Sequence, residues 1–284
     1  MTVVVATAGT ESRSRSLIQA IESLQAQKPR RPEILVIFNG PGVVSGLVDE
    51  VSRMDGVVIR KLEQPGLPNA LNFGRRCIDT EYFGFLDDDD VYLPDALAVR
   101  CKVLDEREDV DVVATNGMLN TQSDSSRLLP AGLDVENDPF GTLFRQNWLA
   151  SCGGLYRTST VDESYFPVYA KYFEWTMTAF LLAMDRKSTF VDESTFVVNE
   201  TAGSLSASDE YVEAYPAILR RMLEFPVDAN VRSLISERLS RALHTASVRN
   251  RDRGLRRAAW RYHIDSLRCR GGLRYLAYTR KLLV

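Results

Sequence analysis

Four consecutive aspartates at residues 87–90 directly follow a run of apolar and small residues, YFGFL, at positions 82–86. Carboxylates this close together repel one another, by about 1 kcal/mol for each close pair in water and by more beside an apolar wall. The next residues, 91–97, read VYLPDAL and predict a turn and a new helix that begins at Pro94. A strand that ends in an acidic turn and leads into a helix is typical of open α/β sheets, which hold ligands at that edge. A solvated acidic loop is the alternative interpretation.

Strand patterns alternate with helical patterns through the first 115 residues. Continuous apolar runs predict strands near residues 2–6, 33–38, 57–59, 82–86 and 109–114. Helical patterns predict helices between them, over residues 14–27, 43–54, 66–78 and 94–104. Strands that are apolar throughout are buried on both faces, so this order predicts an α/β fold with a mostly parallel sheet flanked by helices.

The pattern beyond residue 115 is less regular. It predicts helices over residues 140–145 and 173–184, and strands near residues 148–156, 189–191 and 195–198. From residue 210 the chain has a helical pattern to its end. We therefore expect an α/β domain over residues 1–207, made of the halves 1–115 and 116–207, followed by a helical C-terminal extension over residues 208–284.

The composition argues against several classes of function. A formal net charge of -3 gives the chain as a whole no nucleic-acid signature. Four cysteines without C-x-x-C spacing argue against structural zinc and indicate reduced thiols, and two histidines leave little room for His-based catalysis. The chain shows neither a signal-peptide pattern nor a run of about eighteen apolar residues, so we expect a cytoplasmic protein.

Charge is distributed unevenly along the chain. Residues 241–284 contain twelve Arg and Lys against two Asp, so they carry +10, and the net charge of -3 leaves -13 on residues 1–240. Two interpretations are open. The basic residues form a solvated face that is paired in part with acidic residues, or they contact an anionic membrane surface, which here would be the inner face of the membrane.

Four segments occur in a characteristic order. The first is an apolar strand followed by a turn with Thr7 and Ala8, and the second is a strand that ends at Asn39. The third, residues 66–74, reads GLPNALNFG, of the type G-x-x-x-A-x-N-x-G. The fourth, residues 81–90, reads EYFGFLDDDD, of the type E-Y-x-x-F-L-D-x-D-D. Together they resemble the family 2 glycosyltransferases, which are inverting enzymes with the Rossmann-like GT-A fold, and the resemblance covers about residues 3–206.

This resemblance implies that an acceptor hydroxyl displaces a nucleotide at the anomeric carbon of a nucleotide-sugar. The residues that it assigns to the donor are Thr7, Ala8, Asn39, Gly66, Asn72, Asp87 and Asp88. It makes Asp89 the direct ligand of Mg²⁺ or Mn²⁺, a Lewis acid for the leaving diphosphate, and it gives Asp90 the role of capping the following turn. For Asp87 and Asp90, capping of backbone N–H groups is the competing interpretation.

Two positions depart from the family pattern. Many members carry Arg where this chain has Leu71, so a donor contact is missing or is supplied from elsewhere. Many also carry Asp where this chain has Asn39, whose amide both accepts and donates hydrogen bonds, so the base that it recognises is left open.

A later segment, residues 199–206, reads NETAGSLS and resembles the family segment that ends in S-x-S. A His that can join the metal site often lies just before it in the family, and this chain has none there. Asn199 or Glu200 replaces it, or the metal relies on Asp89 and the donor alone.

The catalytic base implied by the resemblance is a carboxylate at the start of a helix, in a motif of the type E-D or E-D-W. Residues 172–177 read YFEWTM. Aligning on Trp175 places Glu174 at the position of the base, whereas aligning on the Glu places Trp175 there, which accepts no proton. We therefore prefer Glu174 as general base. Its competing interpretation is a first-turn carboxylate favoured by the helix dipole.

The sequence therefore predicts a metal-assisted inverting glycosyltransferase with a nucleotide-sugar donor and a glycan or lipid-linked glycan acceptor. Two alternatives are open. A sugar nucleotidylyltransferase would open with a Gly-rich loop followed by Arg and Lys, which residues 7–11, TAGTE, lack. A catalytically inactive glycan-binding or scaffold protein of the same fold is the second alternative, and the intact aspartates argue against it.

Overall fold

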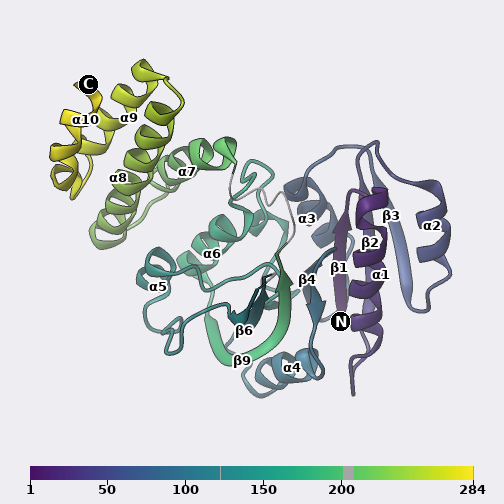
Figure 1. The fold of residues 1–284 in the computed structure, drawn as a ribbon. Helices are drawn as coiled ribbons and strands as arrows, with labels where there is room; N and C mark the ends of the chain where they lie inside the picture. Colours follow the sequence, from purple (N-terminus) through teal and green to yellow (C-terminus); the bar gives the residue numbers. More distant parts are fainter. Residues whose placement is uncertain (122, 201–207, 284) are drawn as a thin grey trace. The chain divides into compact units, whose positions relative to one another are not determined.

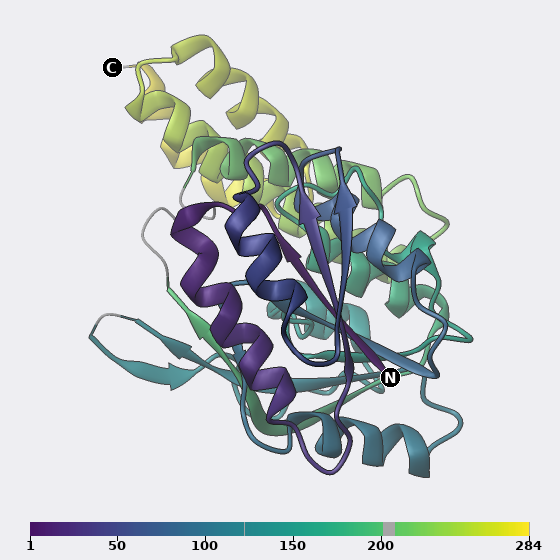
Figure 2. The same ribbon diagram turned by 90° about the vertical axis from the view of Figure 1, so that its right-hand side faces the viewer.

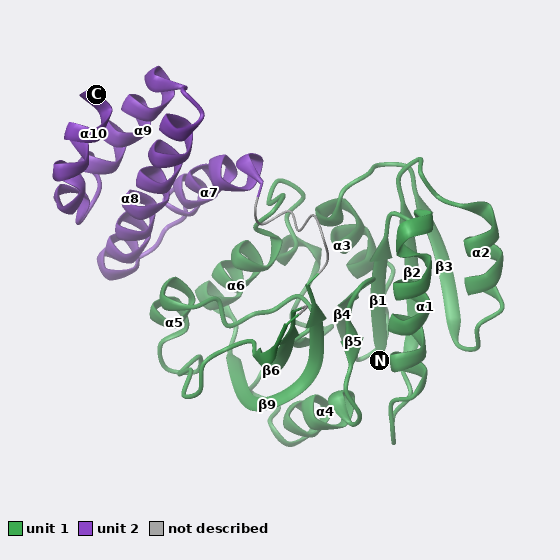
Figure 3. Ribbon diagram, viewed as in Figure 1, with its two compact units in different colours: residues 1–201 green, residues 202–284 purple. Residues whose placement is uncertain are grey.

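The computed structural model describes residues 1–121, 123–200 and 208–283, and the chain divides into two units, Met1–Thr201 and Ala202–Val284 (Figure 3). Each unit is described here by itself. Residues 201–207, which include the S-x-S of residues 204–206 and the expected domain boundary, lie outside the described residues.

Unit 1 is built on a nine-stranded sheet with the order β3-β2-β1-β4-β8-β6-β9-β5, in which β7 pairs with β6 (Figure 1). Four neighbouring strands are all parallel: β1 (Thr2–Thr7), β2 (Glu33–Asn39), β3 (Val57–Leu62) and β4 (Tyr82–Asp87). Because parallel strands share one direction, the carboxyl ends of β1, β2 and β4 meet at the same edge of the sheet. This half of the sheet is the parallel arrangement that the apolar runs predict.

Both faces of this parallel half are covered by helices. The helices are α1 (Glu11–Gln25), α2 (Ser45–Ser52) and α3 (Leu67–Arg76). Val3 and Val5 share a buried cluster with residues of α1 and α2, which lie side by side over one face (Figure 2). On the other face α3 approaches so closely that a Cβ on Gly74 would lie 2.8 Å from side-chain atoms of Val4 and Ile37. A side chain at position 74 would therefore push α3 away from the sheet.

The second half of unit 1 is mixed in strand direction. Its strands are β5 (Val91–Tyr92), β6 (Val112–Asn120), β7 (Ser125–Arg127), β8 (Gly154–Arg157) and β9 (Ser188–Asn199). Its helices are α4 (Ala96–Glu106), α5 (Pro139–Arg145), the 3₁₀ helix η1 (Glu163–Tyr165) and α6 (Glu174–Asp185). β8 is antiparallel to both β4 and β6, whereas β9 runs parallel to β6. The two strands predicted near residues 189–191 and 195–198 form one strand, β9, whose register against β6 shifts between Thr115 and Met118.

The helix after the aspartates begins two residues later than predicted. Pro94 does not occupy its first turn, because Leu93 still donates a backbone hydrogen bond to Thr195 of β9 and extends the pairing of β5. Asp95 then turns the chain with a left-handed backbone (φ 63°), and α4 starts at Ala96.

Unit 2 consists of helices, as the sequence predicts from residue 210. They are α7 (Asp209–Met222), α8 (Ala229–Asp252), α9 (Arg256–Arg268), the 3₁₀ helix η3 (Gly272–Tyr278) and α10 (Thr279–Leu283). Several basic residues pair with acids of this same unit: Arg249 and Arg253 with Asp209, and Arg274 with Glu237. Among the described helices, none is both long and apolar enough to span a membrane.

Candidate functional site

The aspartate turn lies at the carboxyl end of β4, which is held between β1 and β8 and is buried along its length up to Leu86. Asp90 closes the turn by donating its backbone N–H to the carbonyl of Asp87, at 3.2 Å. The four side chains then divide into two pairs. Asp88 and Asp89 contact residues of β1 and α1, whereas Asp87 and Asp90 lie beside Cys152, in the loop before β8.

Arg13, in the first turns of α1, is the cation nearest the first pair. It forms ion pairs with Asp88, at 3.2 Å, and with Asp89. The Thr7 hydroxyl donates a second hydrogen bond to Asp88, at 2.6 Å, and accepts one from the backbone N–H of Gly9. The side chains of Asp88 and Asp89 are only 13% and 19% exposed, so this pairing is partly shielded from water. Arg13 therefore offsets much of the repulsion between these two carboxylates.

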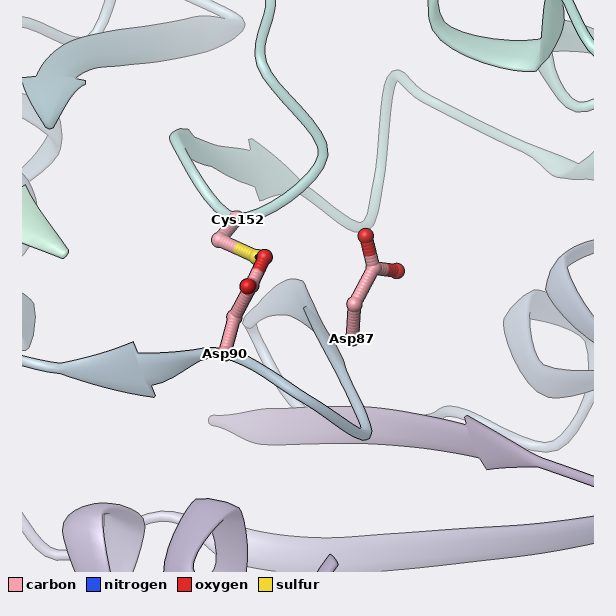
Figure 4. Close-up of side chains that lie close together, drawn as sticks. All are labelled: Asp87, Asp90 and Cys152. Carbon is pink, nitrogen blue, oxygen red and sulfur yellow. The ribbon is translucent and has the colours of Figure 1, made fainter. Parts of the chain in front are cut away.

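Neither Asp87 nor Asp90 forms an ion pair with a cation of the described residues, although the charge of Arg13 acts on Asp87. Asp90 is buried and accepts hydrogen bonds from the backbone N–H of Asn199, at 3.0 Å, and from the thiol of Cys152, at 3.1 Å. Ligand atoms of Asp87, Asp90 and Cys152 lie within 4.8 Å of one another (Figure 4). Burial raises the pKa of Asp90 to about 7. Burial, together with the charge of Asp90, raises the pKa of Asp87 well above its usual range.

Asp90 does not cap the turn that follows it, contrary to the sequence prediction. Its acceptor capacity goes to Asn199, at the end of β9, because β9 pairs with β5 immediately after the turn and brings Asn199 alongside. Asn199 also donates its side-chain amide to the backbone carbonyl of Asp89, at 2.8 Å. Of the two residues considered as substitutes for the missing His, Asn199 therefore contacts the aspartate turn, while the only described hydrogen bond of Glu200 joins its backbone to Asn120.

Four residues implied to bind the donor lie at the ends of β1 and β2 and at the start of α3. Thr7 is the last residue of β1, and the exposed Ala8 follows it. Asn39 is buried at the end of β2 and donates its side-chain amide to the carbonyl of Gly66, at 3.0 Å. Gly66 precedes α3 with a positive φ of 111°, a conformation that favours glycine. The structure thus brings these four residues and the aspartate turn to one edge of the sheet.

The remaining donor candidate, Asn72, is engaged within the protein. Its amide N–H groups donate to the backbone carbonyls of Glu163 and Phe166, at 2.9 and 3.1 Å, and so tie α3 to η1. Leu71, where the family often has Arg, is buried in the core. The guanidinium that lies at the aspartate turn comes instead from Arg13. Sequence reasoning missed Arg13 and Cys152, because neither belongs to one of the four motif segments.

Glu174 is the first residue of α6 and is partly buried. Its carboxylate accepts a hydrogen bond from the backbone N–H of Tyr172, at 3.1 Å. Tyr172 has a φ of 72°, which is strained for a residue with a side chain and is typical of functional sites. Burial raises the pKa of Glu174 above its ordinary value, and the Tyr172 N–H opposes part of this shift.

The position of Glu174 is fixed relative to β4 by an aromatic contact. The neighbouring ring of Trp175 lies edge-on to Phe85, with centroids 5.4 Å apart, and Phe85 is two residues before Asp87. Phe166 packs against both Phe85 and Trp175. This contact anchors the start of α6 against the end of the strand that carries the aspartates.

The carboxylate oxygens of the aspartate turn suit a hard divalent cation. Carboxylate oxygens are the ligands that Mg²⁺ and Mn²⁺ prefer. Burial disfavours the charged forms of Asp87 and Asp90 and raises the pKa of both, and a cation bound beside them would favour the charged forms. Burial also raises the pKa of the Cys152 thiol, so it stays protonated and is a poor ligand for such an ion.

Comparisons with known proteins relate the chain to glycosyltransferases. The model of the family described as "Glycosyl transferase family 2" matches residues 2–153, more than half of the chain. An uncharacterized glycosyltransferase of Rickettsia conorii is 31% identical over 101 residues, which cover 35% of this chain and only 17% of the relative, and one of Rickettsia felis matches equally.

Solved structures show a similar fold. S. aureus TarS, residues 1–349, has a TM-score of 0.62 at 16% identity and covers 88% of this chain and 73% of that chain. The mannosyltransferase PcManGT of Pyrobaculum calidifontis, solved with GDP-Man and Mn²⁺, has a TM-score of 0.58 at 15% identity and covers 87% and 72%. These similarities confirm the predicted fold class.

We expect the substitution Asp90→Asn to stabilise the protein more at pH 8 than at pH 5 in the presence of EDTA. The ordinary Asp pKa is about 3.9. Between that pH and about 7, folded Asp90 keeps a proton that the unfolded chain has lost, so the wild type loses stability as pH rises through this window. Asn lacks this penalty, and its gain should be roughly 2 kcal/mol larger at pH 8. Urea unfolding at both pH values measures the difference.

Asp90→Leu is the matched control. Like Asp90→Asn it removes the titrating carboxyl, but it also leaves the Asn199 N–H without its acceptor, so it should be about 1–3 kcal/mol less stable than Asp90→Asn at both pH values. A gain for Asp90→Asn that is equal at pH 5 and pH 8 would contradict the raised pKa.

Proposed function

The chain belongs to glycosyl transferase family 2, and we propose that it is an inverting glycosyltransferase that moves a sugar from a nucleotide-sugar donor to a hydroxyl of a glycan or lipid-linked glycan. One observation carries this proposal. The aspartate turn shares a sheet edge with Thr7 and Asn39, while the Trp175–Phe85 contact anchors Glu174 against the same strand. A donor site and a candidate base are thereby supported by one rigid element, β4.

The proposed donor site is the edge formed by Thr7, Ala8, Asn39 and Gly66, with Asp87 and Asp88 beside it. Asn39 and Gly66 hold each other through the Asn39 amide, which fixes the loop where a nucleobase would bind. Asn72 contributes by positioning α3 through its contacts with η1. The fold neighbours TarS and PcManGT were solved with UDP-GlcNAc and GDP-Man respectively, which supports a nucleotide-sugar as the donor class.

We assign Asp89 as the direct ligand of Mg²⁺ or Mn²⁺, with Asp87 nearby to support it. When bound, such an ion supplies Lewis-acid stabilisation of the negative charge on the leaving diphosphate. Arg13 already pairs with Asp88 and Asp89, so Arg13 and a metal ion would compete for the same carboxylates. The chain thus offers a cation of its own at the aspartate turn, while it lacks the Arg that many family members carry at the position of Leu71.

Glu174 is the proposed general base. The acceptor oxygen forms a bond to the anomeric carbon, the bond from that carbon to the diphosphate oxygen breaks, and the acceptor proton passes to the Glu174 carboxylate. Burial raises the pKa of Glu174, which makes its carboxylate a stronger base than that of an exposed Glu. The Tyr172 N–H holds one carboxylate oxygen and thereby orients the group.

We expect Glu174→Gln to reduce transfer by about 10²–10⁴-fold and to leave nucleotide binding nearly unchanged, because the amide keeps the shape and accepts no proton. Glucosyl, N-acetylglucosaminyl and mannosyl donors with UDP, GDP or dTDP, incubated with glycan acceptors, supply the assay, and nucleotide release is the readout. Glu193→Gln, an exposed glutamate of β9, is the matched control. Near-normal turnover of Glu174→Gln would remove Glu174 from the mechanism, and inactivity of the wild type with all donors would favour a glycan-binding scaffold.

We expect Mn²⁺ to tighten UDP or GDP binding in the wild type and to have no such effect in Asp89→Asn, because a ligand of the ion has been replaced. Isothermal titration calorimetry with Mn²⁺ and with EDTA measures the enhancement directly. Asp49→Asn, an exposed aspartate of α2, is the control that removes the same charge elsewhere. Full enhancement in Asp89→Asn would transfer the ligand role to another aspartate of the turn.

The basic residues of the C-terminal part of the chain, residues 241–284, also support a proposed contact with an anionic membrane. Leu273, Leu276 and Leu283 are 73%, 57% and 72% exposed, and they alternate along the chain with basic residues. Exposed leucines beside basic side chains suit insertion at the interface of anionic lipid.

We expect the double substitution Leu273→Ser and Leu276→Ser to lower co-sedimentation with phosphatidylglycerol vesicles, with little binding of either protein to neutral vesicles. The control is Val168→Ser, which changes a 53% exposed valine of unit 1. Equal partition of the double variant and the wild type would exclude this contact.

A further inference from the structure

A pocket of about 350 Å³ opens between helices α7 and α8 of unit 2. Its lining residues are Tyr211, Val212, Tyr215, Arg238, Arg241, Ala242 and Thr245. The lining residues of α7 fall within about one turn, and those of α8 recur at three- and four-residue spacing, so each helix presents one face to the pocket. Its volume lies at the small end of the range for ligand sites, roughly 300–1,000 Å³.

The pocket carries positive charge that the described residues do not neutralise. Arg238 donates from Nε to the hydroxyl of Tyr215, at 2.9 Å, and its guanidinium lies 5.7 Å from the centre of that ring. Arg241 is exposed and forms no side-chain hydrogen bond or ion pair with any described residue. Within residues 208–283, neither arginine has a carboxylate partner, whereas Arg249, Arg253 and Arg274 each have one.

Two acidic residues next to pocket residues in sequence, Glu213 and Glu237, are engaged elsewhere. Glu213, which follows Val212 on α7, binds Arg253 and Asn250. Glu237, which precedes Arg238 on α8, binds Arg274. The two guanidinium groups of the pocket therefore have no carboxylate partner among the described residues, and they are available to an anionic ligand.

The walls of the pocket combine this charge with apolar surface. The rings of Tyr211 and Tyr215 provide flat apolar faces with polar hydroxyls at their edges, and Thr245 adds another hydroxyl. Aromatic faces suit the C–H faces of a sugar ring, and hydroxyl groups suit its oxygens. Guanidinium groups bind phosphate and carboxylate groups through paired N–H donors.

We propose that this pocket binds an anionic saccharide unit, a single sugar ring that carries a phosphate or a carboxylate. Binding itself does not depend on the proposed transferase activity. In combination with that activity, an acceptor chain built of such units would gain a second attachment point on the enzyme, which raises its effective concentration. That consequence rests on the proposed function.

The test is calorimetric titration of the full chain, in EDTA and without nucleotide, with four probes: glucose 1-phosphate, glucuronate, glucose and inorganic phosphate. The two anionic sugars should bind more tightly than glucose or phosphate, because each of these offers only half of the contacts. Arg241→Ala should weaken their binding by about tenfold or more, the loss expected for a hydrogen bond to a charged group. The exposed side chain of Arg241 forms no hydrogen bond or ion pair with a described residue, so we expect this change to leave the fold intact.

Two further variants sharpen the result. Arg257→Ala removes the same charge from an exposed position on α9 and should leave binding unchanged. Arg238→Lys keeps the charge but loses the paired donors, so it should also weaken binding. An equal fall in affinity in Arg241→Ala and Arg257→Ala would mean that net charge, and not the pocket, governs binding. That result would overturn the proposal.

The remaining outcomes separate the possible sources of the anion. Inorganic phosphate that binds as tightly as glucose 1-phosphate would overturn the role of the sugar ring. Loss of phosphatidylglycerol-vesicle binding in Arg241→Ala, with no binding of the free anionic sugars to the wild type, would assign the pocket to lipid headgroups and overturn it as well. Glu174→Gln should bind the anionic sugars normally, so failure of the pocket and failure of the proposed catalysis give different results.

Discussion

Four carboxylates at the end of β4 repel one another. Different segments of unit 1 bind different members of this group through ion pairs and hydrogen bonds. Thr7 and Arg13 hold Asp88, and Arg13 also holds Asp89. Asn199 and Cys152 donate hydrogen bonds to Asp90. Segments at the beginning, middle and end of unit 1 therefore meet at one turn. Burial raises the pKa of Asp87 and Asp90, and a cation at the turn would favour their charged forms.

The aromatic contacts at the end of β4 connect this turn to the second half of the sheet. Phe85 reaches Trp175 and Phe166 on one face of the strand, which places the first turn of α6 against it. Glu174 lies at that first turn, and the strained backbone of Tyr172 is held by its carboxylate. The same strand thus supports both the aspartate turn and the partly buried carboxylate of Glu174, so a change in its packing would disturb both.

In unit 2 the basic residues are not equivalent. Some are paired with acids of the same helices and contribute to a solvated, salt-bridged surface of small energetic value. Others, such as Arg241 and Arg238, face the pocket between α7 and α8 without a carboxylate among the described residues. A net charge for the segment hides this difference, because it counts paired and unpaired guanidinium groups alike.

The sequence by itself determined the fold class and most elements of unit 1, because continuous apolar runs and helical spacing record which faces are buried. Its motifs also identified the family, while the roles of Asp89, Glu174 and the donor residues stay predictions. Only the tertiary structure decided which groups meet the aspartates. Arg13 and Asn199 lie far from them in sequence, and no local pattern records that β9 would pair with β5 and carry Asn199 to Asp90. Local periodicity reports burial, whereas charge pairing depends on contacts between distant segments.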